Sequence, residues 1–158
     1  MRRLAALAIA LWLGAAACGA VVRPAPSFDL AGTGKSLKDF RGQTVVVLIT
    51  RSAREKDFRE MVYRLNQIYS QFSAERVIFV AAIENGPQTV LSNIPFVLAA
   101  NPQMVASEYG VNGRYAIAVI GVDGNVDLIT WRMIAAERVR DMVFNNYESQ
   151  AESRKPLP

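Results

Sequence analysis

The chain has 158 residues, a formal net charge of +4, no histidine and a single cysteine, Cys18. Without imidazole the commonest general base and transition-metal ligand is missing, so Ser-His and Cys-His catalysis and the usual zinc, copper and haem sites are excluded. No basic run with interleaved aromatic residues indicates a nucleic-acid partner. The sequence therefore predicts no metal, no cofactor and no nucleic acid.

The first 17 residues have the layout of a bacterial secretory signal. Arg2 and Arg3 come first, an apolar run over residues 4–17 follows, and the run ends in small residues. A run of 14 residues is short for a helix that crosses a bilayer, so we expect residues 1–17 to be removed. The mature chain then has 158 − 17 = 141 residues, the size of one domain.

The end of this segment, Ala-Ala-Ala followed by Cys18, resembles the lipobox of bacterial lipoproteins. The resemblance implies that Cys18 is diacylated and that residues 18–25 form a lipidated tether. Several acyl chains hold a protein firmly on a membrane. Gly19 stands where an Asp would signal retention in the inner membrane, which favours the outer membrane. The alternative is ordinary cleavage after an Ala-x-Ala site, which leaves Cys18 as a free thiol.

The domain itself is expected to span residues 26–147, with residues 148–158 as a flexible tail. Alternating apolar side chains around a Gly-rich turn in residues 27–42 predict a β-hairpin. The continuous apolar run VVVLIT, residues 45–50, predicts a central strand covered on both faces. Apolar residues at three- and four-residue steps between residues 58 and 72 then predict an amphipathic helix.

The second half of the chain alternates further strands and helices. The expected strands are residues 76–83, 95–100, 115–122 and 126–131. A helix begins after Asn101 as its cap, with Pro102 in its first turn, and a last amphipathic helix covers residues 134–147. The last two strands form a hairpin around Asp123-Gly124. This order predicts an α/β fold with a mixed central sheet and helices on both faces.

Two segments of the chain resemble the redoxins, the alkyl hydroperoxide reductase and TlpA-like branch of the thioredoxin superfamily. The first carries the family's opening pattern in Pro26, Phe28, Leu30, Gly34, Leu37, Asp39 and Gly42. The second carries its later signature in Tyr109, Gly110, Val111, Gly113, Asp123 and Gly124. The likeness spans about residues 26–145 and implies a thioredoxin-like fold.

The positions that carry redox chemistry in this family do not match. The resemblance places Arg54 and Asp57 where the two cysteines of Cys-x-x-Cys would stand, and Tyr115 where the family has a cis-proline. A peroxidatic cysteine is absent from the same loop. The resemblance therefore implies a redoxin scaffold without its active site, since function belongs to the site and not to the fold.

Two short motifs have simpler explanations than ligand binding. GTGKS, residues 32–36, resembles the end of a phosphate-binding loop, but Asp29 replaces the first glycine of that motif and no long helix is expected after it. DGNVD, residues 123–127, resembles the start of a calcium loop, but Leu128 stands where glycine is required. We interpret both as hairpin turns.

Cationic residues gather at the junction between the central strand and the helix after it. The candidate binding surface consists of Arg51, Ser52, Arg54, Asp57, Arg114 and Tyr115. Guanidinium groups beside helix N-terminal amides bind carboxylate or phosphate groups. The alternative is an ordinary solvated surface, in which Glu55, Asp57 and Glu60 neutralise the cations.

Three functions remain open on the sequence. The leading hypothesis is a membrane-anchored, non-catalytic thioredoxin-like module that binds another envelope protein. The second is an enzyme, either one that uses Cys18 as a thiol or a hydrolase that uses Ser, Lys or carboxylate groups. The third is a structural subunit of a larger envelope assembly.

Overall fold

The computed structural model describes residues 23–153. The expected signal segment, Cys18 and most of the expected tether lie outside these residues, and so does the end of the expected tail. No helix in the described part of the chain combines the length and the apolar character that crossing a bilayer requires.

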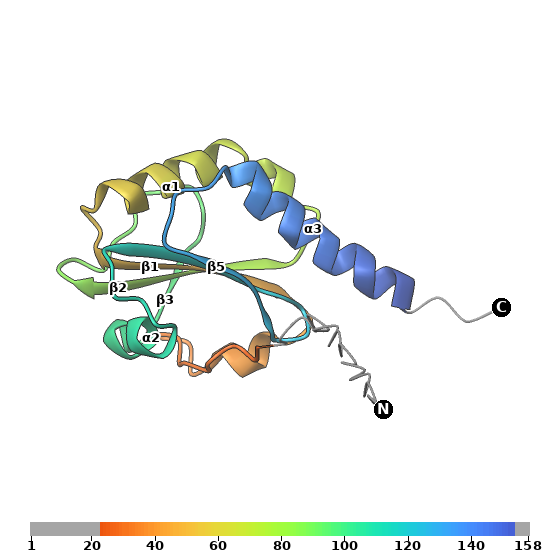
Figure 1. Ribbon diagram of the computed structural model, residues 1–158, viewed down its shortest axis with the longest axis horizontal. Helices are drawn as coiled ribbons and strands as arrows, with labels where there is room; N and C mark the ends of the chain where they lie inside the picture. The colour runs from red at the N-terminus through yellow and green to blue at the C-terminus, as the bar shows by residue number, and fades with distance from the viewer. Residues whose placement is uncertain (1–22, 154–158) are drawn as a thin grey trace, which may run out of the picture.

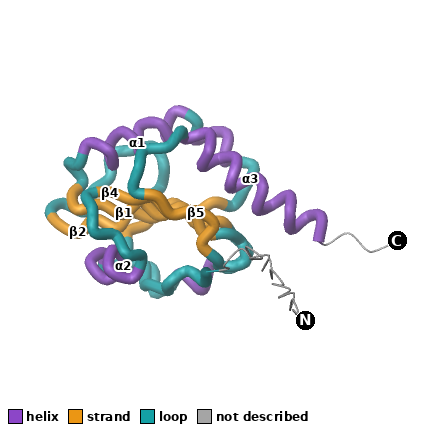
Figure 2. Tube along the Cα trace, viewed as in Figure 1, coloured by secondary structure: helices purple, strands orange, loops and turns teal. Residues whose placement is uncertain are grey.

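A five-stranded mixed sheet forms the centre of the domain, with the order β3-β2-β1-β4-β5. The strands are β1 (Thr44–Ser52), β2 (Val77–Asn85), β3 (Val97–Leu98), β4 (Tyr115–Ile120) and β5 (Val126–Thr130). β1 pairs with β2 in parallel and with β4 in antiparallel orientation. Figure 2 shows the strands stacked between helices and loops on either side. The predicted mixed sheet is confirmed.

Helices cover both faces of this sheet, as the sequence predicts. Figure 1 shows α1 (Lys56–Gln67) and α3 (Ala136–Ser153) over one face and α2 (Pro102–Glu108) over the other. Val46 and Leu48 of β1 belong to the core under α1 and α3. Their neighbours Val45, Val47 and Ile49 belong to the core that faces α2. A strand buried on both faces has no polar face to alternate with, which explains the continuous apolar run.

The expected caps and turns of the second half are present. The Asn101 side chain accepts a hydrogen bond from the backbone N–H of Met104 at 3.1 Å, with Pro102 at the start of α2. Gly124 has a φ of +82°, a value that side-chain-bearing residues rarely adopt, and it closes the turn between β4 and β5. Asp123 accepts a hydrogen bond from the backbone N–H of Asn125 within this turn.

The N-terminal hairpin is shorter than predicted. Its pairing is a single bridge between Asp29 and Ser36, around a turn that contains GTGKS. The chain cannot extend into a second strand because Ser36 and Asp39 form a capping box, in which the Asp39 carboxylate accepts from the Ser36 backbone N–H at 2.7 Å. A 3₁₀ helix, Leu37–Phe40, begins there instead.

Two helix ends also differ from prediction. The apolar stripe after β1 is divided, because α1 ends at Gln67 and a separate 3₁₀ helix covers Tyr69–Phe72. α3 continues past the predicted end at Tyr147 to Ser153. The Tyr147 hydroxyl accepts from the Thr44 backbone N–H and donates to the Arg76 carbonyl, so it ties α3 to the starts of β1 and β2.

A polar contact joins β5 to α3 on the edge of the sheet. The Asn146 side-chain amide donates to the Asp127 carboxylate at 2.8 Å. Partial burial raises the pKa of the Asp127 carboxyl, the Asn146 hydrogen bond lowers it, and the nearby Asp123 charge raises it. The net effect is a raised pKa, so the fold favours the protonated form of Asp127.

We predict that Asp127→Asn changes the pH dependence of stability. Because the folded pKa lies above the unfolded one, the wild-type chain loses stability relative to the variant as pH rises from about 4, the ordinary Asp pKa, through the raised folded-state pKa. Thermal melting of both proteins across this range measures the difference. Asn146→Ala should enlarge the loss, since it removes the hydrogen bond that favours the charged form. Parallel pH profiles for the wild type and Asp127→Asn would contradict the prediction.

Candidate functional site

The candidate binding surface lies where β1 ends and α1 begins. The strand ends at Ser52 and the helix starts at Lys56, with Glu55 at the cap position but no side-chain capping hydrogen bond. The Ser52 hydroxyl accepts from the backbone N–H of Arg54 at 3.2 Å and holds the loop in its turn. Arg54 and Asp57 are both exposed.

The pairing of β1 with β4 brings a second segment to the same place. Thr50 lies opposite Tyr115, and the backbone N–H of Arg51 donates to the Arg114 carbonyl at 3.0 Å. The six residues that the sequence singles out therefore lie around the end of one strand, although two of them are more than fifty positions later in the chain.

Thr50 is a positioning residue that the sequence analysis did not single out. Its side chain is 1% exposed, and its hydroxyl donates to one of two carbonyls, Ser52 at 2.9 Å or Arg114 at 3.1 Å. The same oxygen accepts from the Ser52 backbone N–H. The hydroxyl thus joins the β1 end to the start of β4. A polar residue at the end of an otherwise apolar strand is the only sequence signal for this role.

Tyr115 is a core residue and not an exposed member of the surface. Its side chain is 3% exposed, belongs to the core under α1, and its hydroxyl has no hydrogen-bond partner. Burial raises the pKa of the Tyr115 phenol well above its usual value, and the negative charge of Asp57 raises it further. The phenol is therefore neutral and lies near the Asp57 carboxylate.

The cations of the junction have no ion-pair partner among the described residues. The two ion pairs found there join Arg64 to Glu60 and Arg140 to Asp141, each at 2.8 Å. Glu60 is thus engaged with Arg64 one turn along α1, and it does not neutralise the loop. Arg51, Arg54 and Arg114 are exposed. Whether this surface binds a ligand stays a prediction.

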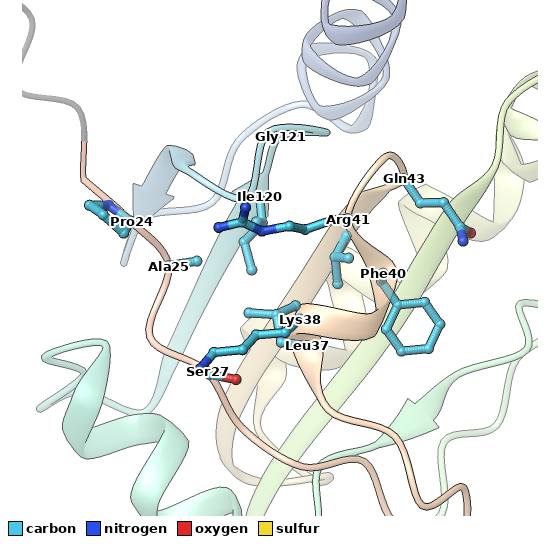
Figure 3. A pocket seen from close by; sticks show the side chains of 12 residues that line it. Pro24, Ala25, Ser27, Leu37, Lys38, Phe40, Arg41, Gln43, Ile120 and Gly121 are labelled. Atoms are coloured by element: carbon cyan, nitrogen blue, oxygen red, sulfur yellow. The ribbon is translucent and has the colours of Figure 1, made fainter.

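A small cavity at the other end of the sheet does not extend this site. It has a volume of about 150 Å³ and lies between the N-terminal segment, the first 3₁₀ helix and the start of the β4–β5 turn. Figure 3 shows Arg41 reaching across it toward Ile120 and Gly121, with Lys38 and Leu37 beside it. Its volume is below that of typical ligand pockets.

The described residues contain no group of three His, Cys, Asp or Glu side chains placed to hold a metal ion. Residues 23–153 also contain no cysteine, because the single cysteine of the chain, Cys18, precedes them. This part of the chain therefore has no thiol.

Comparisons with known proteins identify the fold. No family model and no curated protein matches the sequence. A Chlorobium tepidum structure assigned as the thiol:disulfide interchange protein DsbE is similar with a TM-score of 0.66 and 21% identity, covering 79% of this chain and 96% of that chain. The reduced 2-Cys peroxiredoxin of Plasmodium vivax gives a TM-score of 0.58 and 13% identity over 81% and 96%.

A third similar structure is the exposed lipoprotein thioredoxin of Streptococcus pneumoniae. Its TM-score is 0.56 with 16% identity, and the match covers 76% of this chain and 99% of that chain. The chain therefore has the thioredoxin-like fold that the sequence predicts. Identities this low show the fold and leave the activity to the residues of the site.

Two buried tyrosines should respond oppositely to loss of their hydroxyl groups. The Tyr109 hydroxyl donates to the Pro26 carbonyl at 3.0 Å, whereas that of Tyr115 has no partner. We expect Tyr109→Phe to lower the free energy of unfolding by about 1 kcal/mol and Tyr115→Phe to raise it by about 1 kcal/mol. Urea titration of both variants measures the two changes. A loss of stability in Tyr115→Phe would mean that its hydroxyl has a partner in solution.

The expectation that Arg54 and Asp57 occupy the two cysteine positions of the redoxins can be tested by placing cysteines there. We expect Arg54→Cys combined with Asp57→Cys to form a reversible intrachain disulfide, because the two positions are separated by two residues at a helix start. Thiol titration before and after oxidation measures it. Arg54→Cys with Glu60→Cys, one turn further along α1, is the control and should stay reduced. If neither pair oxidises, the loop does not hold the redoxin geometry.

Proposed function

We propose that this protein is a relative of the redoxins whose domain lacks cysteine, and that it binds a protein partner and does not catalyse a redox reaction. The observation that carries the proposal is the intact thioredoxin-like sheet with Arg54, Asp57 and Tyr115 at the end of β1, where the reactive groups would stand. Thiol-disulfide exchange needs a thiolate as nucleophile, and none of these side chains supplies one.

Binding is supported by the charges that the junction exposes. Arg51, Arg54 and Arg114 lie together without an acidic partner among the described residues. An exposed guanidinium group next to the first turn of a helix attracts carboxylate groups. A partner with acidic side chains on its surface therefore fits this junction better than a basic one.

We further propose that the protein is held at the bacterial cell envelope by acylation of Cys18, facing the periplasm. The lipobox-like sequence supports this, and Gly19 favours the outer membrane. A protein of the same fold is described as an exposed lipoprotein thioredoxin. Tethering keeps such a module near other envelope proteins and raises its effective concentration there.

An enzymatic function is the second candidate, because the similar structures include thiol:disulfide interchange proteins and a peroxiredoxin. A free thiol at Cys18 would supply the nucleophile from outside the described domain. A histidine-free hydrolase that uses Ser, Lys or carboxylate groups is the other form of this candidate. A structural role in an envelope assembly differs from the first proposal only in the permanence of the contact.

We expect the purified protein to show no turnover above background in insulin reduction with dithiothreitol or in peroxide consumption. The variant with Arg54→Cys and Asp57→Cys serves as the control that the assay detects a restored motif. Mass spectrometry of the mature N-terminus is done on the same preparation, because an acylated Cys18 cannot act as a thiol. Turnover by the wild-type protein would contradict the proposed non-catalytic function. An unmodified Cys18 would contradict the proposed acylation.

A further inference from the structure

A groove of about 530 Å³ runs along the flank of α1, beside the loop that joins β2 to β3. One side is a stripe of α1 and the residues just before it, and the other side is the loop. The lining residues are Ala53, Arg54, Phe58, Arg59, Val62, Tyr63, Asn66, Pro87, Thr89, Val90 and Leu91. Only Arg54 belongs also to the candidate binding surface.

Side-chain hydrogen bonds hold the loop wall of the groove at both ends. The Gln88 side-chain amide donates to the Ile83 carbonyl at 2.7 Å, next to the end of β2. At the far end the Asn66 side-chain oxygen accepts from the Asn93 backbone N–H at 3.3 Å and from the Ser92 hydroxyl at 3.4 Å. The groove is therefore formed before any partner arrives, which lowers the entropy that binding must overcome.

The walls of the groove are apolar and its charges have one sign. Phe58, Val62 and Val90 face it, and Arg54 and Arg59 are its only charged residues. Neither arginine forms an ion pair with an acid of the described chain. The groove thus suits an occupant that combines an apolar side with negative charge.

The exposed rim of the groove favours a polypeptide over a small amphiphile as its occupant. Leu91 is 91% exposed and Tyr63 is 61% exposed, although both line the groove. A small ligand inside the groove leaves much of these rim side chains in water. A chain that crosses the groove covers both the rim and the interior, and large apolar anchors in preformed pockets supply most of the affinity at protein interfaces.

We infer that this groove binds a segment of a partner protein, with a large apolar side chain inside it and acidic side chains against Arg54 and Arg59. The inference rests on the proposed binding function and assigns it to a surface and a class of partner sequence. The segment carries Asp or Glu next to Leu, Ile, Phe or Trp.

Phage display of random peptides on the immobilised chain without its first 22 residues tests the inference, since both cores and all five strands lie in the remainder. We expect enriched peptides to place an acidic residue next to a large apolar one. A labelled peptide from this set, followed by fluorescence anisotropy, should lose affinity by about tenfold or more for Arg54→Glu with Arg59→Glu, and severalfold for Leu91→Ser.

Arg76→Glu is the matched control, because Arg76 is an exposed arginine just before β2, at the opposite end of the sheet. This variant should keep the affinity within about twofold. Enriched peptides without acidic residues, or no enrichment at all, would overturn the inference. Binding of decanoate in the groove without any peptide binding would also overturn it, because the occupant would then be a lipid.

One result separates this inference from the proposed function. If the peptides lose affinity for Arg114→Glu and keep it for Arg59→Glu alone and for Leu91→Ser, the protein is a binding module whose surface lies at the β1 end, and the groove is not its site. Turnover in the redox assays contradicts the proposed function whatever the groove binds.

Discussion

β1 contributes side chains to both cores at once. Val46 and Leu48 pack under α1 and α3, and Val45, Val47 and Ile49 pack on the side of α2. Its backbone is paired on both edges, with β2 on one side and β4 on the other. A strand held on two faces and two edges has no room to shift, so its end at Ser52 and the start of α1 are fixed in space. The positions of the candidate-site residues at the end of β1 and the start of α1 depend on that constraint.

The same strand end and helix start carry different residues in this chain from those of a thiol enzyme with the same fold. In a thiol enzyme the helix start lowers the pKa of a cysteine and the neighbouring loop faces it. Here the helix start carries Arg54 and Asp57, and the first residue of β4 is Tyr115, whose ring belongs to the core while its hydroxyl lacks a partner. An unpaired buried hydroxyl is unfavourable for stability. The Tyr115 ring is therefore needed for packing, whereas its hydroxyl group contributes no stability.

Charge and shape divide the surface around α1 into two parts. At the end of β1 the side chains are polar, with Arg51, Ser52 and Arg114 around a rigid turn. Along the flank of α1 the surface is apolar and concave, and Arg54 stands between the two parts. A partner segment that places acidic side chains on this arginine can contact both surfaces. Because the groove lining contains no acidic residue, we expect the groove to prefer a partner segment with acidic side chains.

The sequence determined the order of elements, the two-sided burial of β1, the Asn101 cap and the absence of cysteine from residues 23–153, because these depend on local patterns and residue identity. It placed Arg51 and Ser52 near Arg114 and Tyr115 only through a resemblance, since pairing between distant strands leaves no local pattern. The burial of Tyr115, the linking role of Thr50 and the groove were decided by tertiary structure. Each depends on which segments pack together, as when Asn66 of α1 holds the loop at Asn93.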